Sequence, residues 1–206
     1  MRVAAMMERA FVFVILALAS TAGVAKYDNE MKEPKTDRYS LDDRCVNAIQ
    51  HQINEEMHAS LIYMNMAAHF DSNSVGRKGF AKFFKHSSDE EREHAQKLID
   101  YVNKRSGKVI AFDIKMPGKD DWKSGLEALE DAMNLEKHVN NKLHHLHHMA
   151  DKICSDPHLM DFIEGEFLTE QVDSINEYKT YISQLGAMNS GMGEYLFDRQ
   201  LLEKSD

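Results

Sequence analysis

The chain has 206 residues, of which 43% are hydrophobic and 29% charged, which is enough to bury one core but leaves little room for a second domain. Only 3 prolines and 10 glycines occur over this length, so long helices and an all-α fold are favoured. The formal net charge of −9 argues against nucleic acid as a partner and favours cations.

The first 25 residues differ in composition from the rest of the chain. Two arginines precede an apolar run over residues 10–19, and small residues follow it at 22–25. This order is typical of a secretory signal peptide, so we expect residues 1–25 to be cleaved and the mature domain, residues 26–206, to be secreted. A membrane anchor is the alternative, but sixteen uncharged residues fall short of the roughly 20 that a spanning helix needs.

Apolar residues recur at helical spacing in five segments, which we expect to form helices over residues 41–70, 75–104, 122–153, 157–185 and 191–202. Ser40 is expected to cap the first helix, an aspartate just before Trp122 the third, and Asp156 the fourth. Gly79 weakens the start of the second helix, and Gly186 is expected to stop the fourth.

The segment between the second and third helices, residues 105–121, lacks the helical pattern and includes a β-like stretch at 109–112. Seventeen extended residues span about 55 Å, whereas a helix of about 28 residues is only about 42 Å long. The connector can therefore run the length of a bundle and make the second and third helices parallel. We expect a four-helix bundle in the order up, down, down, up, with a short fifth helix.

Four of the expected helices carry polar residues at positions that the apolar pattern assigns to the core. These residues are Glu56 and Tyr63 in the first helix, Glu91 and His94 in the second, Glu136 in the third and Gln171 in the fourth. Burying a carboxylate is costly unless it is paired or binds a metal. A single Glu-x-x-His pair is usually a surface pair, but ligand-type residues at a similar depth in four helices predict a metal site. Oxygen donors with one imidazole suit iron.

The predicted ligands are distributed unequally over two metal positions. One iron would have Glu56, Glu91 and His94, whereas its neighbour would have only the shared Glu91 and Glu136. The third helix has no histidine three residues after Glu136, and the fourth offers only the amide of Gln171, so the chain matches half of the usual di-iron bundle pattern. We expect a weak second position, from which oxidised iron can leave.

Six segments resemble the H chain of animal ferritins. They are residues 52–56 (QINEE), 89–95 (DEEREHA), 121–126 (DWKSGL), 135–137 (LEK), 156–159 (DPHL) and 194–198 (EYLFD). The resemblance covers essentially the whole mature chain. It implies a ferritin-like bundle that oxidises Fe(II) with O2 or peroxide at a site for two irons and stores ferric mineral. By this resemblance Glu56, Glu91, His94 and Glu136 are the iron ligands, with Tyr63 and Gln171 completing the site.

The resemblance also implies an octahedral cage of twenty-four subunits, built from this chain alone or with a second ferritin chain. Asp161 and Glu164 match carboxylates that line a three-fold iron-entry channel, with His147 near its mouth. Without the resemblance, these acids would be ordinary residues that favour a helix start. Glu90 and Glu93 match acids that nucleate mineral, although a glutamine replaces the third acid expected one turn later.

Two functions of other classes share parts of this pattern. A purely structural cage subunit, co-assembling with an active partner, would keep the fold and the channel, but light-type ferritin chains lose the ligands that this chain keeps. A secreted helical-bundle ligand would share the topology, but it has no use for metal-binding residues in its core. We therefore expect an oxidising subunit.

The two cysteines lie at the same end of such a bundle. Cys45 is at the start of the first helix, and Cys154 is in the turn between the third and fourth helices. Because the secretory route is oxidising, we expect a disulfide within one subunit. A disulfide between neighbouring subunits and two free thiols are the alternatives that the sequence leaves open.

Overall fold

A computed structural model describes residues 37–188 and 191–204. The expected signal peptide, residues 1–25, lies outside the described residues. The chain divides into two units, Met1–Arg38 and Tyr39–Asp206, and the second contains every helix described below. None of the described helices is long and apolar enough to cross a membrane.

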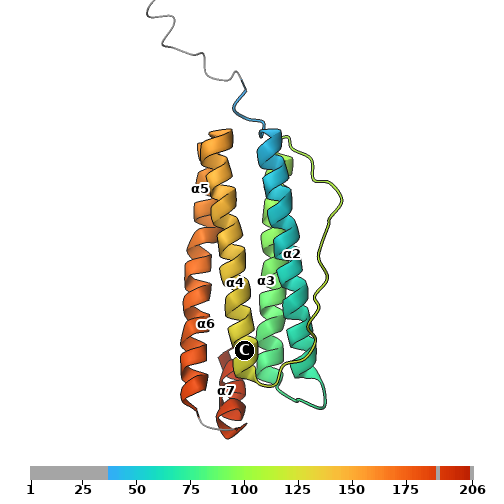
Figure 1. The fold of residues 1–206 in the computed structure, drawn as a ribbon, viewed down its shortest axis with the longest axis vertical. Helices are drawn as coiled ribbons and strands as arrows, with labels where there is room; N and C mark the ends of the chain where they lie inside the picture. The colour runs from blue at the N-terminus through green and yellow to red at the C-terminus, as the bar shows by residue number, and fades with distance from the viewer. Residues whose placement is uncertain (1–36, 189–190, 205–206) are drawn as a thin grey trace, which may run out of the picture. The chain divides into compact units, whose positions relative to one another are not determined.

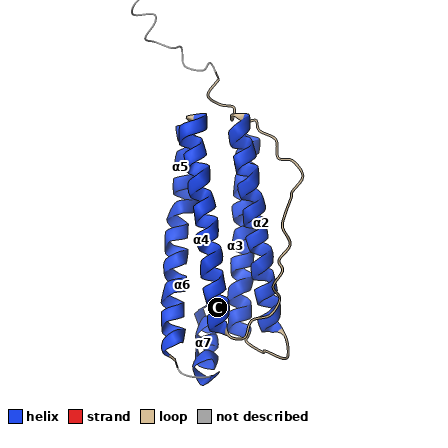
Figure 2. Ribbon diagram, viewed as in Figure 1, coloured by secondary structure: helices blue, strands red, loops and turns tan. Residues whose placement is uncertain are grey.

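The second unit is helical, and its described residues form no strand (Figure 2). Its elements are α2 (Asp43–Asp71), α3 (Lys78–Lys104), α4 (Gly125–His148), η1 (Met149–Cys154), α5 (Pro157–Ile163), η2 (Glu164–Leu168), α6 (Thr169–Ala187) and α7 (Gly191–Lys204). The two η segments are π-helical: η1 extends α4, and η2 joins α5 to α6. These elements form four long helical rods, as the sequence predicts: α2, α3, α4 with η1, and α5 with η2 and α6. The short helix α7 is the predicted fifth helix.

The connector, residues 105–124, runs along the side of the bundle from the end of α3 to the start of α4 (Figure 1). It has no regular structure, including at 109–112, and it is held to α2 by side-chain contacts. The backbone N–H of Ile110 donates to Gln50 at 3.0 Å. Because the connector crosses the whole bundle, α3 and α4 are parallel, and the predicted up, down, down, up order is confirmed.

The starts and ends of the helices differ from expectation by a few residues. Asp42 caps α2 in place of Ser40, and Ser124 caps α4 in place of the aspartates before Trp122. Each cap accepts a hydrogen bond from a backbone N–H of the first turn. Asp156 caps α5 as predicted. The expected stop at Gly186 is wrong, since α6 includes this residue.

The start of α3 is stabilised by another helix. Asp198 of α7 is buried and accepts a hydrogen bond from the Phe80 backbone N–H at 3.0 Å. Gly79 permits this approach, because a Cβ there would lie 1.8 Å from the carbonyl oxygen of Asp198. The glycine that weakens α3 in isolation is therefore the residue that lets α7 dock.

The buried apolar side chains form two clusters, one towards each end of the bundle. On three of the rods a polar residue lies between the two clusters: Glu91 between Phe84 and Ala95, Glu136 between Ala132 and Val139, and Gln171 between Phe167 and Tyr178. On α2, Glu56 lies between Ile53 and Ala59 of the first cluster, two turns before Tyr63 of the second. These four polar residues are themselves buried. Each of the four rods thus carries a buried polar residue at or near the boundary between the two clusters.

A disulfide joins Cys45, at the start of α2, to Cys154, at the end of η1, with a Cα–Cα distance of 6.4 Å. Beside it, Arg44 Nη2 donates to the carbonyl oxygen of Ile153 at 3.2 Å. The expectation of an intrachain bond is confirmed. No free cysteine remains among the described residues.

The π-helical segments explain how Cys154 reaches its partner. Leu146, Ala150 and Cys154 are all buried and follow one another at steps of four. Four residues of an α-helix advance by about 400°, which is about 40° beyond a full turn, so such a row drifts away from the core. The wider turns of a π-helix counteract this drift. The same spacing recurs through η2 in the buried residues Leu159, Ile163, Phe167 and Gln171.

Candidate metal centre

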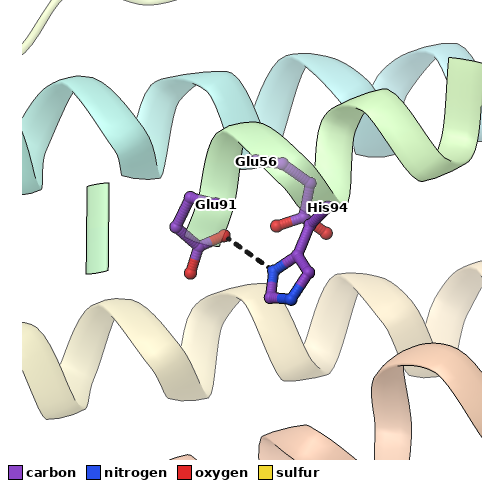
Figure 3. Close-up of side chains that lie close together, drawn as sticks. All are labelled: Glu56, Glu91 and His94. Carbon is purple, nitrogen blue, oxygen red and sulfur yellow. Dashed lines mark ion pairs between the residues drawn. The ribbon is translucent and has the colours of Figure 1, made fainter. Parts of the chain in front are cut away.

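Glu56, Glu91 and His94 meet in the middle of the bundle (Figure 3). Glu91 and His94 lie three residues apart on α3 and therefore share a face, while Glu56 comes from α2. One ligand atom from each of the three lies within 4.8 Å of the others, and His94 Nδ1 is 3.5 Å from Glu91 Oε2. All three residues are buried. The structure thus brings together the residues predicted for the first iron.

Glu136 and Gln171 approach the same place from α4 and α6. The phenol of Tyr63 donates a hydrogen bond to Glu136 Oε1, and Gln171 Nε2 donates to Glu136 Oε2 at 2.9 Å. Glu91, Glu136 and Gln171 line one cavity of about 740 Å³, which opens between α3 and α6. The predicted second position therefore has two carboxylates and one amide around it.

Several buried oxygen atoms at this level have no hydrogen-bond partner. Within residues 37–188 and 191–204, four buried side-chain polar atoms lack one, and three of them are Glu56 Oε2, Glu91 Oε2 and Gln171 Oε1. An unpaired buried carboxylate oxygen is costly. These three oxygens are all hydrogen-bond acceptors, and those of Glu91 and Gln171 belong to residues that line the cavity, so the group fits a cation and not an anion.

The carboxylates also disfavour one another's ionisation. Burial, together with the charge of Glu91, raises the pKa of Glu56 well above its usual range. Burial and the charge of Glu136 do the same to the pKa of Glu91. Burial and Glu136 raise the pKa of the Tyr63 phenol, which keeps its proton and donates it in the hydrogen bond. Divalent cations would relieve this repulsion by binding the carboxylates in ionised form.

Two residues that the sequence pattern did not single out also contact the side chains of the metal centre. Gln52, one turn before Glu56, donates from Nε2 to Glu56 Oε1 at 2.8 Å. Glu170, the neighbour of Gln171, places Oε1 3.1 Å from His94 Nε2. The sequence gives a weak indication of Gln52, because it lies four residues before Glu56 and therefore on the same face of the helix. The sequence gives no such indication of Glu170, because adjacent residues of a helix point about 100° apart and Glu170 adjoins Gln171.

The residues expected outside the centre lie as follows. His147 Nε2 is 2.6 Å from Glu164 Oε1, so these two are brought together. Asp161 is exposed on α5, three residues before Glu164. On α3, Glu90 is half-buried and lines the 740 Å³ cavity. Glu93 is exposed and is not among the residues that line it.

Comparison with known proteins gives two findings. Residues 46–188 match the family described as ferritin-like domain. The chain is also similar to a protein named Soma ferritin from Lymnaea stagnalis, with 49% identity over 160 residues, which is 76% of this chain and 90% of that protein. The matched segment includes the residues of the metal centre: Glu56, Tyr63, Glu91, His94, Glu136 and Gln171.

Proposed function

The chain belongs to the ferritin family, a membership that supports a role in iron storage, and on this premise we propose that each subunit oxidises Fe(II) at the metal centre and delivers Fe(III) to a stored mineral. The observation that carries the proposal is the convergence of Glu56, Glu91 and His94 in a core where oxygen acceptors lack partners. A core without a metal-binding role would gain stability from apolar residues at these positions.

Iron is the substrate of this reaction. Glu56, Glu91 and His94 would bind the first Fe(II), with Glu91 shared between two metal positions. Glu136 would bind the second, held in place by its hydrogen bonds from Tyr63 and Gln171. Three carboxylates balance most of the charge of two Fe(II) ions, and an oxygen-rich ligand set with one imidazole also accommodates Fe(III).

The oxidation balances with O2 as the acceptor. Each Fe(II) gives up one electron, so a pair of irons reduces one O2 by two electrons, and two protons complete hydrogen peroxide. A further pair of Fe(II) can reduce that peroxide to water with two more protons. Because the second position has two carboxylates and a neutral amide, it holds iron weakly. Weak binding lets the oxidised product leave for the store.

The test removes two ligands of the first iron. Glu91→Ala combined with His94→Ala is expected to lower the initial rate of Fe(II)-dependent O2 consumption by about 100-fold or more, because both side chains would bind the metal directly. Size-exclusion chromatography should show unchanged assembly, since both residues lie inside one subunit. The matched control, Asp100→Ala with His145→Ala, removes an exposed carboxylate and an exposed imidazole. Equal rates in the two double variants would refute the site.

We extend the proposal to the assembly. The subunits would form an octahedral cage of twenty-four, alone or with a second ferritin chain. Asp161, Glu164 and His147 would line its iron-entry channel, and Glu90 and Glu93 would nucleate mineral on its inner face. The pairing of His147 with Glu164 supports a common role for these two residues.

Secretion after removal of residues 1–25 is part of the same proposal. The disulfide supports it, because such bonds persist in oxidising compartments. Sequencing the N-terminus of protein collected from the medium of expressing cells tests it. Lys26 is the expected first residue, and an uncleaved N-terminus would refute the cleavage site.

A further inference from the structure

We propose that Glu170 is a positioning residue of the metal centre, which fixes the ring of His94 so that Nδ1 faces the iron. This inference rests on the proposed function, because it assumes that His94 is a ligand. The observation behind it is that the two nitrogens of one imidazole face different carboxylates. Nδ1 is 3.5 Å from Glu91 Oε2, and Nε2 is 3.1 Å from Glu170 Oε1.

The chemistry of a metal-bound imidazole requires this division. A neutral ring binds a metal through the lone pair of one nitrogen while the other nitrogen carries the proton. Nδ1 faces the predicted ligand Glu91, so it would be the nitrogen that binds the metal, and Nε2 would carry the proton. Glu170 accepts the hydrogen bond from Nε2–H. A carboxylate in this position selects the tautomer and makes the metal-binding nitrogen more basic.

The surroundings of the ring leave Glu170 as the residue that decides its rotation. Phe167, one turn earlier on the same rod, packs edge-on against the imidazole with a centroid distance of 5.7 Å. This apolar contact confines the ring but offers no hydrogen bond. Glu170 is 44% exposed at its side chain, so it can reach His94 Nε2 without being fully removed from solvent.

The π-helical turn η2 brings both functional residues of this rod to the centre. Phe167 lies within η2, and Glu170 and Gln171 follow at the start of α6. Gln171 is the last residue of the buried row that begins at Leu159 and continues at steps of four. The adjacent Glu170 therefore lies on the side of the helix that faces His94 of α3. A regular α-helix would turn this row away from the core by about 40° at each step of four residues.

Co(II) is the probe for the test, because its binding is followed by visible absorption without any redox reaction. Glu170→Ala in the full-length assembled protein is expected to weaken Co(II) binding at the first position by about 10- to 100-fold. Glu170→Gln should lose less, because its amide oxygen can still accept the Nε2–H bond. The control is Glu166→Ala, which removes a carboxylate four residues earlier that pairs with Lys97 of α3 at 3.5 Å. It should bind Co(II) as the unmodified protein does.

A double-mutant cycle separates positioning from direct ligation. In a His94→Ala background, adding Glu170→Ala should cause no further loss of Co(II) affinity, because Glu170 acts through the ring. An additional loss there would mean that Glu170 binds the metal itself and would overturn the proposal. Unchanged affinity in Glu170→Ala alone would also overturn it while leaving the proposed function intact. If Glu91→Ala with His94→Ala bound Co(II) normally, the proposed function would fail instead.

Discussion

At the scale of single residues, the sequence predicted the members of the metal centre wherever a side chain lies on the buried face of a helix, among apolar residues at helical spacing. Glu91 and His94 could be paired because three residues separate them on one helix, and Glu56 because it shares a stripe with Ile53. Glu170 could not be found in this way, since it lies on the flank of its helix and resembles any half-exposed acid. Hydrogen bonds between side chains of different rods depend on distances that no single-helix pattern contains.

An ion pair at the corner between η1 and α5 makes a residue-scale prediction. Arg105 Nη2 lies 2.7 Å from Asp156 Oδ2, and both side chains are largely buried. Burial opposes the ionisation of Asp156, but the hydrogen bonds from Arg105 and from the Leu159 backbone N–H outweigh it and hold the pKa of Asp156 below its usual value. A lowered pKa in the folded state means that the stabilisation is complete above the unfolded pKa of about 4 and is lost as the pH falls further.

Asp156→Asn should therefore destabilise the protein by roughly 1 to 3 kcal/mol at pH 7 and by progressively less below about pH 4. Asparagine still caps α5, so the change isolates the charge. Thermal denaturation of both proteins at a series of pH values from neutral to acidic provides the measurement. A difference in midpoint that stays constant down to pH 3 would contradict the ion-pair explanation.

At the scale of elements, helix existence and order were predictable, but the ends and the turns of each helix were not. The observed capping residues of α2 and α4 lie two or three residues from the predicted ones. Several polar residues precede each of these helices, and only the path of the backbone decides which of them caps the helix. The π-helical turns left a trace in the buried row at steps of four from Leu159 to Gln171. Such a row is readable only once burial is known.

The docking of α7 on α3 gives an element-scale prediction. Gly79→Ala would place a methyl group 1.8 Å from the backbone oxygen of Asp198, and no side-chain rotation can relieve a backbone clash. We expect α7 to shift, with a loss of about 1 to 3 kcal/mol. Gly186→Ala is the matched control, because a Cβ there meets nothing within 4 Å and alanine favours the helix.

Thermal midpoints, together with proteolysis between α6 and α7, measure this difference. Faster cleavage in Gly79→Ala than in Gly186→Ala is expected, since α7 loses the contact that holds it. Equal midpoints for the two variants would show that the close approach of the two helices is not required.

At the scale of the whole molecule, the length of one connector predicted the topology. The segment of residues 105–121 is long enough to run the length of the bundle, and this favoured parallel second and third helices before any contact was known. The assembly is different in kind. It depends on surfaces between copies, which the periodicity inside one chain does not describe, and it entered only through the resemblance.

The proposed entry channel makes a prediction at this scale. Asp161→Asn combined with Glu164→Gln should slow the oxidation of externally added Fe(II) several-fold at low salt and less at high salt, because carboxylates from several copies attract cations electrostatically. Stopped-flow measurement of O2 consumption provides the rate. Glu130→Gln, which removes an exposed carboxylate of α4, is the control and should oxidise iron normally. The same slowing in disassembled subunits would mean that these acids do not control entry.

The disulfide has a consequence for how the shell could be handled. The chain has two cysteines, and each is the partner of the other, so neither can cross-link one subunit to the next. In a cage made from this chain, every interface between subunits would be held by non-covalent contacts, while each subunit has its own internal disulfide. The subunits of such a cage could be separated and reassembled without a reductant, and they would come back without scrambled cross-links.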